Sequence, residues 1–412
     1  MSPKNESRNN GLNYPVLLSI LILLFFGVIM VYDASVVYSR EIFGSKYRFL
    51  FLQSAWALAG LFLLYFVSKV DYHHWLKFVP FLLTVSSVLL LLLAWPHLPL
   101  FKLIYPKFIF EKVNFLPFVY GAYRWVVVNP SPLPELPFIG RFSFQPTELA
   151  KLFFVLYFAK ILVLPEKYLY KRFGNSFRRI LLTRFLPVFC LFTLLTVLQP
   201  DLGTAVILSV IAGAEYFVSR APLRFFFISI ILFFAIAFLF ILTSPYRRER
   251  LATFINPSAA ETLGGGYHIR QIMIALGSGG LTGLGFGQSR QKYEYIPEVT
   301  TDSIFAVIGE EFGFIGTSLV IFLFLILVYN GFRIARFAAD ETGRLIAFGI
   351  TVWLGGQSLI NLSAMAGLMP LTGVPLPLVS YGGSATVIIL VALGILLNID
   401  RQTVKRGSGA IY

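Results

Sequence analysis

Apolar runs, separated by short polar or turn-rich joints, recur from one end of this 412-residue chain to the other. Most are long enough to cross the ~30 Å hydrocarbon core of a bilayer as a helix. Because a chain in lipid must pair its backbone hydrogen-bonding groups internally, these runs predict an all-α polytopic membrane protein with about ten transmembrane helices. The expected helix cores are residues 15–32, 49–67, 78–95, 148–164, 185–198, 204–218, 225–242, 303–329, 345–368 and 386–397.

The joints between these runs predict the orientation of the chain. An even number of crossings places both termini on one side, and the short joints on that side are rich in lysine and arginine, as cytoplasmic loops are. We therefore expect cytoplasmic tails at residues 1–14 and 399–412 and one transmembrane domain at 15–398 in the cytoplasmic (inner) membrane. Two long extracytoplasmic loops are expected at about 96–147 and 243–302.

Composition narrows the functional classes. The formal charge of +14 is spread over short loops instead of one soluble face, so topology and lipid phosphate explain it better than nucleic-acid binding. The single cysteine, Cys190, excludes an intramolecular disulfide and a CxxC motif, and the four histidines form no HExxH pattern. The residues therefore indicate no metal-binding motif and no evident cofactor.

The two long loops contain unusual backbone. The first is rich in proline, which resists regular helix and predicts a fixed irregular path that caps the outer face. The second contains a glycine series from Gly277 to Gly287 that matches neither nucleotide-binding motif, because no strand precedes it. We interpret this series as a close-packed, re-entrant or interfacial segment. Both loops also carry cations, and because long outer loops escape the positive-inside rule, this basic excess indicates function.

Asp302 lies where the second long loop meets the apolar run 303–329, so we expect it in the first turn of a membrane helix. A carboxylate at that position complements the helix dipole. It can also act as a general base at the edge of low dielectric, where partial desolvation raises its basicity. Composition alone does not choose between the two roles.

Other polar residues enter or border the apolar runs. Glu148 and Lys151 are three residues apart and are expected to pair on one helix face, either as a structural tie or as part of a substrate path. Glu310 and Glu311 are adjacent and point to different faces, so one of them is expected to join an internal network. Asp201 lies in a predicted tight turn, where an aspartate typically accepts backbone N–H groups.

Two further segments are candidates for ligand contacts. Arg247 and Arg250 share one helical face just outside the membrane, where they bind either a substrate or anionic headgroups. Residues 367–385 contain three prolines and a glycine pair, which predicts irregular backbone at an outer membrane edge. Buried irregular backbone in a membrane protein usually lines a cavity. The polar and glycine positions of this segment are Ser380, Tyr381, Gly382, Gly383 and Ser384.

Seven ordered segments resemble the SEDS (shape, elongation, division and sporulation) family, which includes the FtsW, RodA and SpoVE types, and the likeness covers nearly the entire chain. The segments are GAYRW at 121–125, FSFQPTELAK at 142–151, LQPDLGTA at 198–205, PYRRERLATFINP at 245–257, GYHIRQIMIALGSGG at 266–280, QKYEYIPEVTTDSIFAVIGEE at 291–311 and PLPLVSYGGSA at 375–385.

This resemblance implies a ten-helix peptidoglycan glycosyltransferase that polymerises lipid II outside the cytoplasmic membrane. It implies lipid II and undecaprenyl-pyrophosphate-linked glycan as ligands, and a class B penicillin-binding protein and other divisome or elongasome proteins as partners. By the family motifs, Asp302 is the expected catalytic residue. The expected substrate-binding residues are Arg48, Arg124, Glu148, Lys151, Arg247, Arg250, Arg270, Lys292, Ser380 and Tyr381. The expected structural or cavity-lining residues are Gln199, Asp201, Glu310, Gly382, Gly383 and Ser384.

A carboxylate suits this reaction, because the 4-hydroxyl of an acceptor sugar must lose a proton as it attacks the anomeric carbon of a lipid-pyrophosphate sugar. The leaving pyrophosphate needs compensating charge, either from these cations or from a divalent cation such as Mg or Mn.

The chain departs from the family pattern at two motifs. Phe51 and Leu52 replace a common basic pair before Gln53, and Arg48, on the same helix face as Leu52, is the expected substitute. The common HTDF sequence around the aspartate is TTDS at residues 300–303.

The sequence leaves the role within the family open. QKYEYIPE is similar to the division type, FtsW, whereas GVPLPLVSYGGS is closer to the elongation type, RodA, and we predict the division type. The insertion around residues 101–120 has no family interpretation. The alternatives are an elongation-type polymerase and a lipid II flippase that performs no glycosyl transfer.

Overall fold

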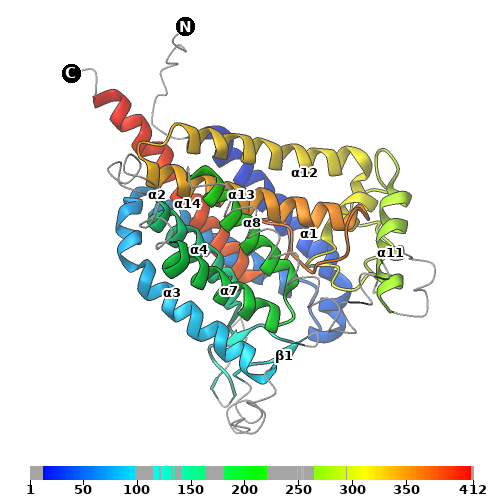
Figure 1. Ribbon diagram of the computed structural model, residues 1–412. Coiled ribbons are helices and arrows are strands. Elements are labelled where there is room, and N and C mark those ends of the chain that lie inside the picture. Colours follow the sequence, from blue (N-terminus) through cyan, green and yellow to red (C-terminus); the bar gives the residue numbers. More distant parts are fainter. Residues whose placement is uncertain are drawn as a thin grey trace.

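The computed structural model describes residues 13–97, 115–119, 122–131, 133–134, 141–163, 181–219, 264–293 and 295–409, together with residues 248, 252 and 254. The chain forms a bundle of long helices (Figure 1). The helices that overlap predicted apolar runs are α1 (Tyr14–Phe43), α2 (Arg48–Lys69), α3 (Tyr72–Ala94), α4 (Pro146–Leu162), α7 (Leu186–Leu198), α8 (Leu202–Val218), α12 (Ile304–Arg336), α13 (Glu341–Met365) and α14 (Gly383–Gly409).

Within the described residues, six of these helices are long and apolar enough to span a membrane, namely α1, α2, α3, α12, α13 and α14. The helices α7 and α8 are shorter but also apolar. The prediction of an all-α polytopic membrane protein is therefore confirmed. The predicted run 225–242 lies outside the described residues.

α1 and α14 extend furthest past their predicted cores. α1 continues beyond residue 32 to Phe43 and ends where Gly44 adopts the left-handed conformation (φ 68°) that commonly closes a helix. α14 continues to Gly409, so the polar tail expected from residue 399 onwards begins as helix. There, Gln402 Nε2 donates to Asn398 Oδ1 one turn earlier, at 2.9 Å. Apolarity marks where a helix crosses lipid, but polar residues can continue the same helix into water.

Shorter elements connect the bundle. The 3₁₀ turn η1 (Trp95–His97) follows α3, the π-helix η4 (Leu181–Phe185) leads into α7, and α11 (Gly264–Gly279) lies in the second predicted outer loop. Two antiparallel strand pairs lie in the first loop, β1 (Phe118–Val119) with β2 (Ala122–Tyr123) and β3 (Val126–Val127) with β4 (Ser143–Phe144). Leu116 and Val126 pack on Leu93 near the end of α3, so the described part of this loop covers one end of the bundle.

The bundle has two ends, which we call the termini end and the site end. At the termini end, Tyr72 of α3 donates its hydroxyl to Asp340 Oδ2 at 2.6 Å and its backbone N–H to Asn398 Oδ1 at 3.1 Å. These bonds join the starts of α3 and α13 to the last turns of α14, and the start of α1 lies at the same end (Figure 1). The site end holds the end of α1, the starts of α2, α4, α8 and α12, and the end of α13.

α12 is broken inside the bundle at Gly313, whose φ of 63° and ψ of −158° interrupt the helix. A broken helix leaves backbone N–H and C=O groups unpaired, which is costly in apolar surroundings. The glycine-rich segment 280–285 pairs these groups from the side. Residues 284 and 285 donate to the carbonyls of residues 310 and 311 at 2.9 and 3.0 Å, and residues 314 and 315 donate to those of residues 280 and 281 at 2.9 and 3.1 Å.

Glycines allow this close approach of two backbones. A Cβ atom on Gly279 would lie 1.9 Å from the carbonyl oxygen of Gly309, and one on Gly283 would lie 2.1 Å from that of Glu311. These contacts agree with our interpretation of the glycine series as a close-packed segment. The apolar run 303–329 gave no indication of the break.

We expect Gly313→Ala to destabilise the protein strongly. Its backbone conformation is essentially restricted to glycine, and the added Cβ would lie 2.4 Å from the backbone nitrogen of Gly283. Strain and overpacking together should cost about 2–4 kcal/mol of unfolding free energy. The measurement is the thermal unfolding midpoint of the purified protein in detergent.

Gly277→Ala is the matched control, because Gly277 lies in α11 and nothing lies within 4 Å of its Cβ position. Alanine is the better helix former, so this variant should be as stable as the wild type or slightly more stable. Equal midpoints for both alanine variants would contradict the proposed packing at Gly313.

Candidate functional site

Asp302 lies in the turn that precedes α12. The N-cap of the helix is Ser303, so Asp302 is one residue outside the helix and not in its first turn as predicted. The helix starts late because Glu298, with φ of 50°, begins a turn. The carbonyl of Glu298 accepts the N–H groups of Thr301 and Ser303 at 3.1 and 3.4 Å. The Asp302 side chain is 6% exposed, and its Oδ1 accepts a hydrogen bond from Thr301 Oγ1 at 3.4 Å.

Two contacts hold this turn against the segment between α13 and α14. Asn361, near the end of α13, donates from Nδ2 to the carbonyl of Asp302 at 2.7 Å and to that of Val374 at 2.8 Å. The N–H of Tyr381 donates to the carbonyl of Thr300 at 2.8 Å. The position of Asp302 is therefore set by contacts to its own carbonyl and to the carbonyl of Thr300.

The Glu148–Lys151 pair forms as the spacing predicted. Lys151 Nζ lies 2.8 Å from Glu148 Oε1, and both side chains are buried in α4. The ammonium also donates to Gln357 Oε1 at 2.9 Å and lies 5.2 Å from the ring centre of Trp353. Glu148 Oε2 is buried and has no hydrogen-bond donor among the described residues, so one acceptor of the pair stays available.

α13 connects this pair to the Asp302 turn. Gln357 accepts from Lys151 and donates from Nε2 to the carbonyl of Pro375 at 2.9 Å. Asn361, one helical turn further along, binds the carbonyl of the adjacent residue Val374 and that of Asp302. Two amides on one helix thus fix neighbouring carbonyls of the segment that lies between the buried pair and the aspartate.

The SYGGS turn, residues 380–384, is held by contacts from α2 and from the end of the first predicted outer loop. Gln53, which is fully buried, donates to the carbonyl of Ser380 and to Thr386 Oγ1, both at 3.4 Å, and its Oε1 accepts from the N–H of Gly382 at 3.4 Å. Ser384 Oγ accepts from the N–H of Gln145 at 3.2 Å. Further contacts are Ser380 Oγ with the N–H of Leu376 (2.8 Å), Tyr381 edge-on to Phe49, and the Gly383 backbone against Trp56.

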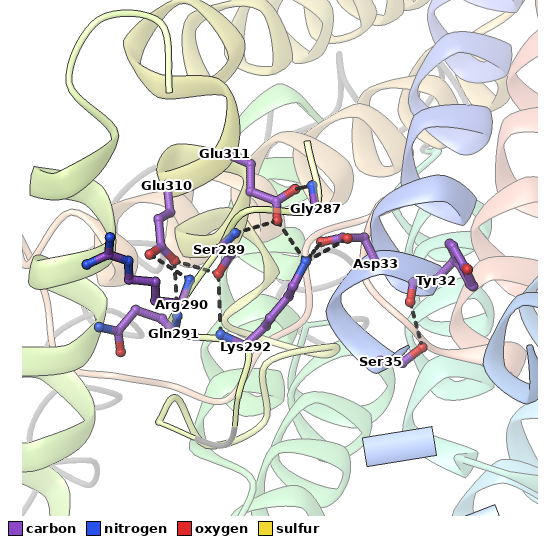
Figure 2. Close-up of polar contacts among 10 residues, drawn as sticks. All are labelled: Tyr32, Asp33, Ser35, Gly287, Ser289, Arg290, Gln291, Lys292, Glu310 and Glu311. Atoms are coloured by element: carbon purple, nitrogen blue, oxygen red, sulfur yellow. Dashed lines mark hydrogen bonds and ion pairs between the residues drawn. The ribbon is translucent and has the colours of Figure 1, made fainter. Parts of the chain in front are cut away.

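Glu310 and Glu311 both join a buried polar network, whereas we expected only one of them to do so (Figure 2). The carboxylate of Glu310 accepts from Ser289 Oγ at 2.5 Å and from the N–H groups of Arg290 and Gln291 at 3.0 and 3.3 Å. Both glutamates can take part because the loop after α11 folds back over the first turns of α12 and reaches two helix faces.

Glu311 binds the other half of this network. It accepts from the N–H groups of Gly287 and Ser289 at 3.1 and 3.0 Å, and from Lys292 Nζ at 3.1 Å. Lys292 Nζ also donates to both carboxylate oxygens of Asp33 in α1, at 2.8 and 3.0 Å (Figure 2). The loop, α12 and α1 are therefore joined by two carboxylates and one ammonium.

Lys292, which we expected to bind substrate, pairs with two carboxylates of the protein in this structure. The side chain is buried between Asp33 and Glu311, so its charge is neutralised inside the protein. Burial lowers the pKa of the ammonium, but the hydrogen bonds and charges of the two carboxylates outweigh it and raise that pKa. The stabilisation from the ammonium is complete below the ordinary lysine pKa and is lost only as the pH rises through the raised value, so the ammonium keeps its charge at neutral pH.

The QPDLG turn, residues 199–203, makes contacts that stabilise the fold. Asp201 caps α8, accepting from the N–H and the hydroxyl of Thr204 at 3.0 and 2.8 Å, as expected of a turn aspartate. Gln199 is fully buried and donates to the carbonyl of Leu90 at 2.8 Å. Arg124, which we expected to bind substrate, donates instead to the carbonyls of residues 199 and 200 at 3.3 and 2.5 Å, where the end of α7 leaves backbone acceptors unpaired.

Four predicted cations remain, and the structure describes two of them, Arg48 and Arg270. Arg48 begins α2 and lies 4.3 Å from the ring centre of Phe43. Arg270 is exposed on α11. Arg247 and Arg250 lie outside the described residues.

Several residues at this site were missed by the sequence reasoning. His268 Nε2 lies 2.9 Å from Ser303 Oγ, beside Asp302. The amides Gln357 and Asn361 carried a usable signal, because polar residues four apart in an apolar helix share one face. Among the described residues, no group of three or more His, Cys, Asp or Glu side chains is arranged to hold a metal ion.

We expect Lys292→Met to lower the free energy of unfolding by about 3–5 kcal/mol, because it leaves the carboxylates of Asp33 and Glu311 buried without their ammonium. Asp33→Asn should cost less, since the pair of Lys292 with Glu311 remains. Thermal unfolding midpoints in detergent, measured for both variants, test this order. A larger loss for Asp33→Asn would show that the ammonium does not neutralise the group.

The sequence of this chain matches a known protein family. The sequence profile of the family described as "Cell cycle protein", which groups FtsW, RodA and SpoVE, matches residues 14–405. Stage V sporulation protein E of Bacillus subtilis is 36% identical over 384 residues, covering 93% of this chain and 95% of that protein. The probable peptidoglycan glycosyltransferase FtsW of Nitrosomonas europaea is 34% identical over 419 residues, covering 99% and 98%.

Solved structures share the fold. The rod shape determining protein RodA of Thermus thermophilus has a TM-score of 0.63 at 23% identity, covering 97% of this chain and 99% of that one. A chain from a peptidoglycan synthase complex, described in work on the coordination of polymerization and crosslinking, has a TM-score of 0.69 at 24% identity, covering 96% and 99%. The match of the family profile over nearly the whole chain, with these relatives, shows that the chain belongs to the SEDS family of FtsW, RodA and SpoVE.

Proposed function

We propose that this protein is a peptidoglycan glycosyltransferase that polymerises lipid II into glycan strands, with Asp302 as the general base. The observation that carries the proposal is the buried Asp302 carboxylate at the site end, held by Asn361 and the Tyr381 backbone and linked through α13 to the Glu148–Lys151 pair. Relatives at 33–36% identity include several named probable peptidoglycan glycosyltransferase FtsW.

In the proposed reaction, the 4-hydroxyl oxygen of the acceptor sugar forms a bond to the anomeric carbon of the donor. The bond from that carbon to the pyrophosphate oxygen breaks, and the pyrophosphate leaves with the electron pair. Asp302 takes the hydroxyl proton, and its burial in a fixed turn lowers the reorganisation needed for this step.

The leaving pyrophosphate needs positive charge nearby. Within the described chain we propose Lys151, Arg48 and Arg270 for this role. Lys151 is paired with Glu148, as Lys292 is with Asp33 and Glu311, but Gln357 connects the Lys151 pair to the segment beside Asp302. Arg247 and Arg250 complete the proposed set, and a divalent cation such as Mg or Mn would supply the same compensating charge.

The proposal includes the setting of the reaction. The basic short joints favour cytoplasmic termini, so the site end faces the outer side of the cytoplasmic membrane. Among the relatives reported above are FtsW and SpoVE, which favours a role in septal synthesis over elongation. A class B penicillin-binding protein is the proposed partner, because the structural relative with a TM-score of 0.69 comes from a peptidoglycan synthase complex.

Asp302→Asn and Asp302→Ala should reduce polymerisation by about 10²–10⁴-fold, the usual contribution of a general base. The assay is glycan polymer formed from labelled lipid II by the reconstituted protein, with and without a class B penicillin-binding protein. Glu41→Gln is the control, because Glu41 is an exposed carboxylate at the same end of the bundle, and it should retain wild-type activity.

Full activity in both Asp302 variants would refute the general base. If wild type and variants form no polymer while lipid II crosses liposomes, the protein is a flippase and the glycosyltransferase proposal is wrong.

Asn361→Leu should lower kcat by about 100-fold with little change in KM, because it leaves the carbonyls of Asp302 and Val374 unpaired and lets the carboxylate shift. Steady-state polymerisation kinetics measure kcat and KM separately and so test this prediction. Asn330→Leu is the matched control. Asn330 is also a buried amide in a membrane helix, but its Nδ2 donates to the carbonyl of Ile326 within α12, so its replacement should leave kcat unchanged.

If the two leucine variants have equal kcat values, Asn361 does not position the aspartate.

A further inference from the structure

A groove of about 640 Å³ opens at the termini end of the bundle, where α8, α12 and α13 meet. It lies far from the Asp302 turn, because Arg344 in the groove and Asn361 at the turn are 17 residues apart on α13, or roughly 25 Å along the helix. The mechanism proposed above does not use this groove. It is lined by Val218, Phe332, Ala335, Arg336, Arg344 and Phe348.

The groove has a cationic layer and an aromatic layer. On α12, Arg336 follows Phe332 by four residues, and on the next helix, α13, Arg344 precedes Phe348 by four. Only residues 337–340 separate the two helices, which run in opposite directions. Residues four apart share one face of a helix, so both arginines lie at the end of the bundle and both phenyl rings lie one turn deeper. The rings pack together with their centres 5.2 Å apart.

The arginines keep donors for a ligand. Arg344 donates from Nη2 to the carbonyl of Val218 at 2.8 Å, and its Nε lies 3.1 Å from Glu341 Oε2. A guanidinium has five N–H donors, so these contacts leave others available. Arg336 is exposed, with its guanidinium 5.6 Å from the ring centre of Phe337.

The nearby carboxylates do not cancel this charge. Asp340 is occupied by the Tyr72 hydroxyl and the Gly343 N–H. Glu341 is half exposed and can turn to water while a ligand binds Arg344. Arg333, one turn before Arg336 on α12, adds a further cation at this end.

We propose that this groove binds an anionic phospholipid from the leaflet at the termini end, with its phosphate between Arg336 and Arg344 and an acyl chain along Phe332 and Phe348. Basic pockets between membrane helices suit anionic headgroups, because charge attraction adds to burial of the chain. A soluble phosphate would use the arginines but leave the apolar floor uncovered. The two layers together therefore match a lipid and not a free anion.

Native mass spectrometry of the delipidated full-length protein tests this proposal. Dioleoylphosphatidylglycerol is the probe, dioleoylphosphatidylcholine the zwitterionic comparison, and glycerol phosphate the soluble anion. The wild type should bind the anionic lipid in preference to the zwitterionic one. In the double variant Arg336→Gln with Arg344→Gln, binding of phosphatidylglycerol should weaken by about 30-fold, while binding of phosphatidylcholine is unchanged.

The matched control is Lys69→Gln with Arg401→Gln. It removes the same charge at the same end but outside the groove lining, and it should keep wild-type affinity. Arg336→Gln alone, a change at an exposed side chain, replaces the double variant if that one does not fold and should weaken binding by about fivefold.

Three results would overturn the proposal. They are equal losses in the groove and control variants, equal binding of the two lipids by the wild type, and displacement of phosphatidylglycerol by glycerol phosphate at comparable concentrations.

Discussion

A backbone group that is left unpaired inside an apolar bundle is costly, and the site end of this protein is built around that constraint. α12 breaks at Gly313, and the glycine-rich segment after α11 supplies the missing hydrogen bonds. The same segment then continues into the loop that covers Glu310 and Glu311, and from there into the turn of Asp302. The hydrogen bonds at the break thus fix the start of the chain segment that runs from residue 280 to the proposed catalytic residue Asp302.

The helices and some side-chain pairs were predictable from local patterns. Apolar length marks a membrane helix, and the spacing of three residues brought Glu148 and Lys151 together as expected. The capping role of Asp201 followed from turn chemistry. Boundaries were less predictable, because polar residues extended α1 to Phe43 and α14 to Gly409 without any change in backbone conformation.

Contacts between segments that are distant in sequence could not be predicted from local patterns. Lys292 looked like a free cation because its partners, Asp33 and Glu311, are 259 and 19 residues away in sequence. The break at Gly313 was hidden because a glycine within an apolar run is also compatible with an unbroken helix. Asn361 lay in a helix that was predicted correctly, yet only the tertiary structure shows that it contacts the Asp302 carbonyl.

The order of these elements along the chain has a consequence for membrane insertion. Translation produces residues 280–285 before it produces Gly313, so the backbone donors and acceptors that the broken helix needs already exist when α12 is synthesised. The second half of α12 can therefore leave the translocon as an independent helix, while the first half docks onto a segment that is already at the membrane. A circular permutation that reversed this order would expose the unpaired groups to lipid during biogenesis, even though the final contacts would be the same.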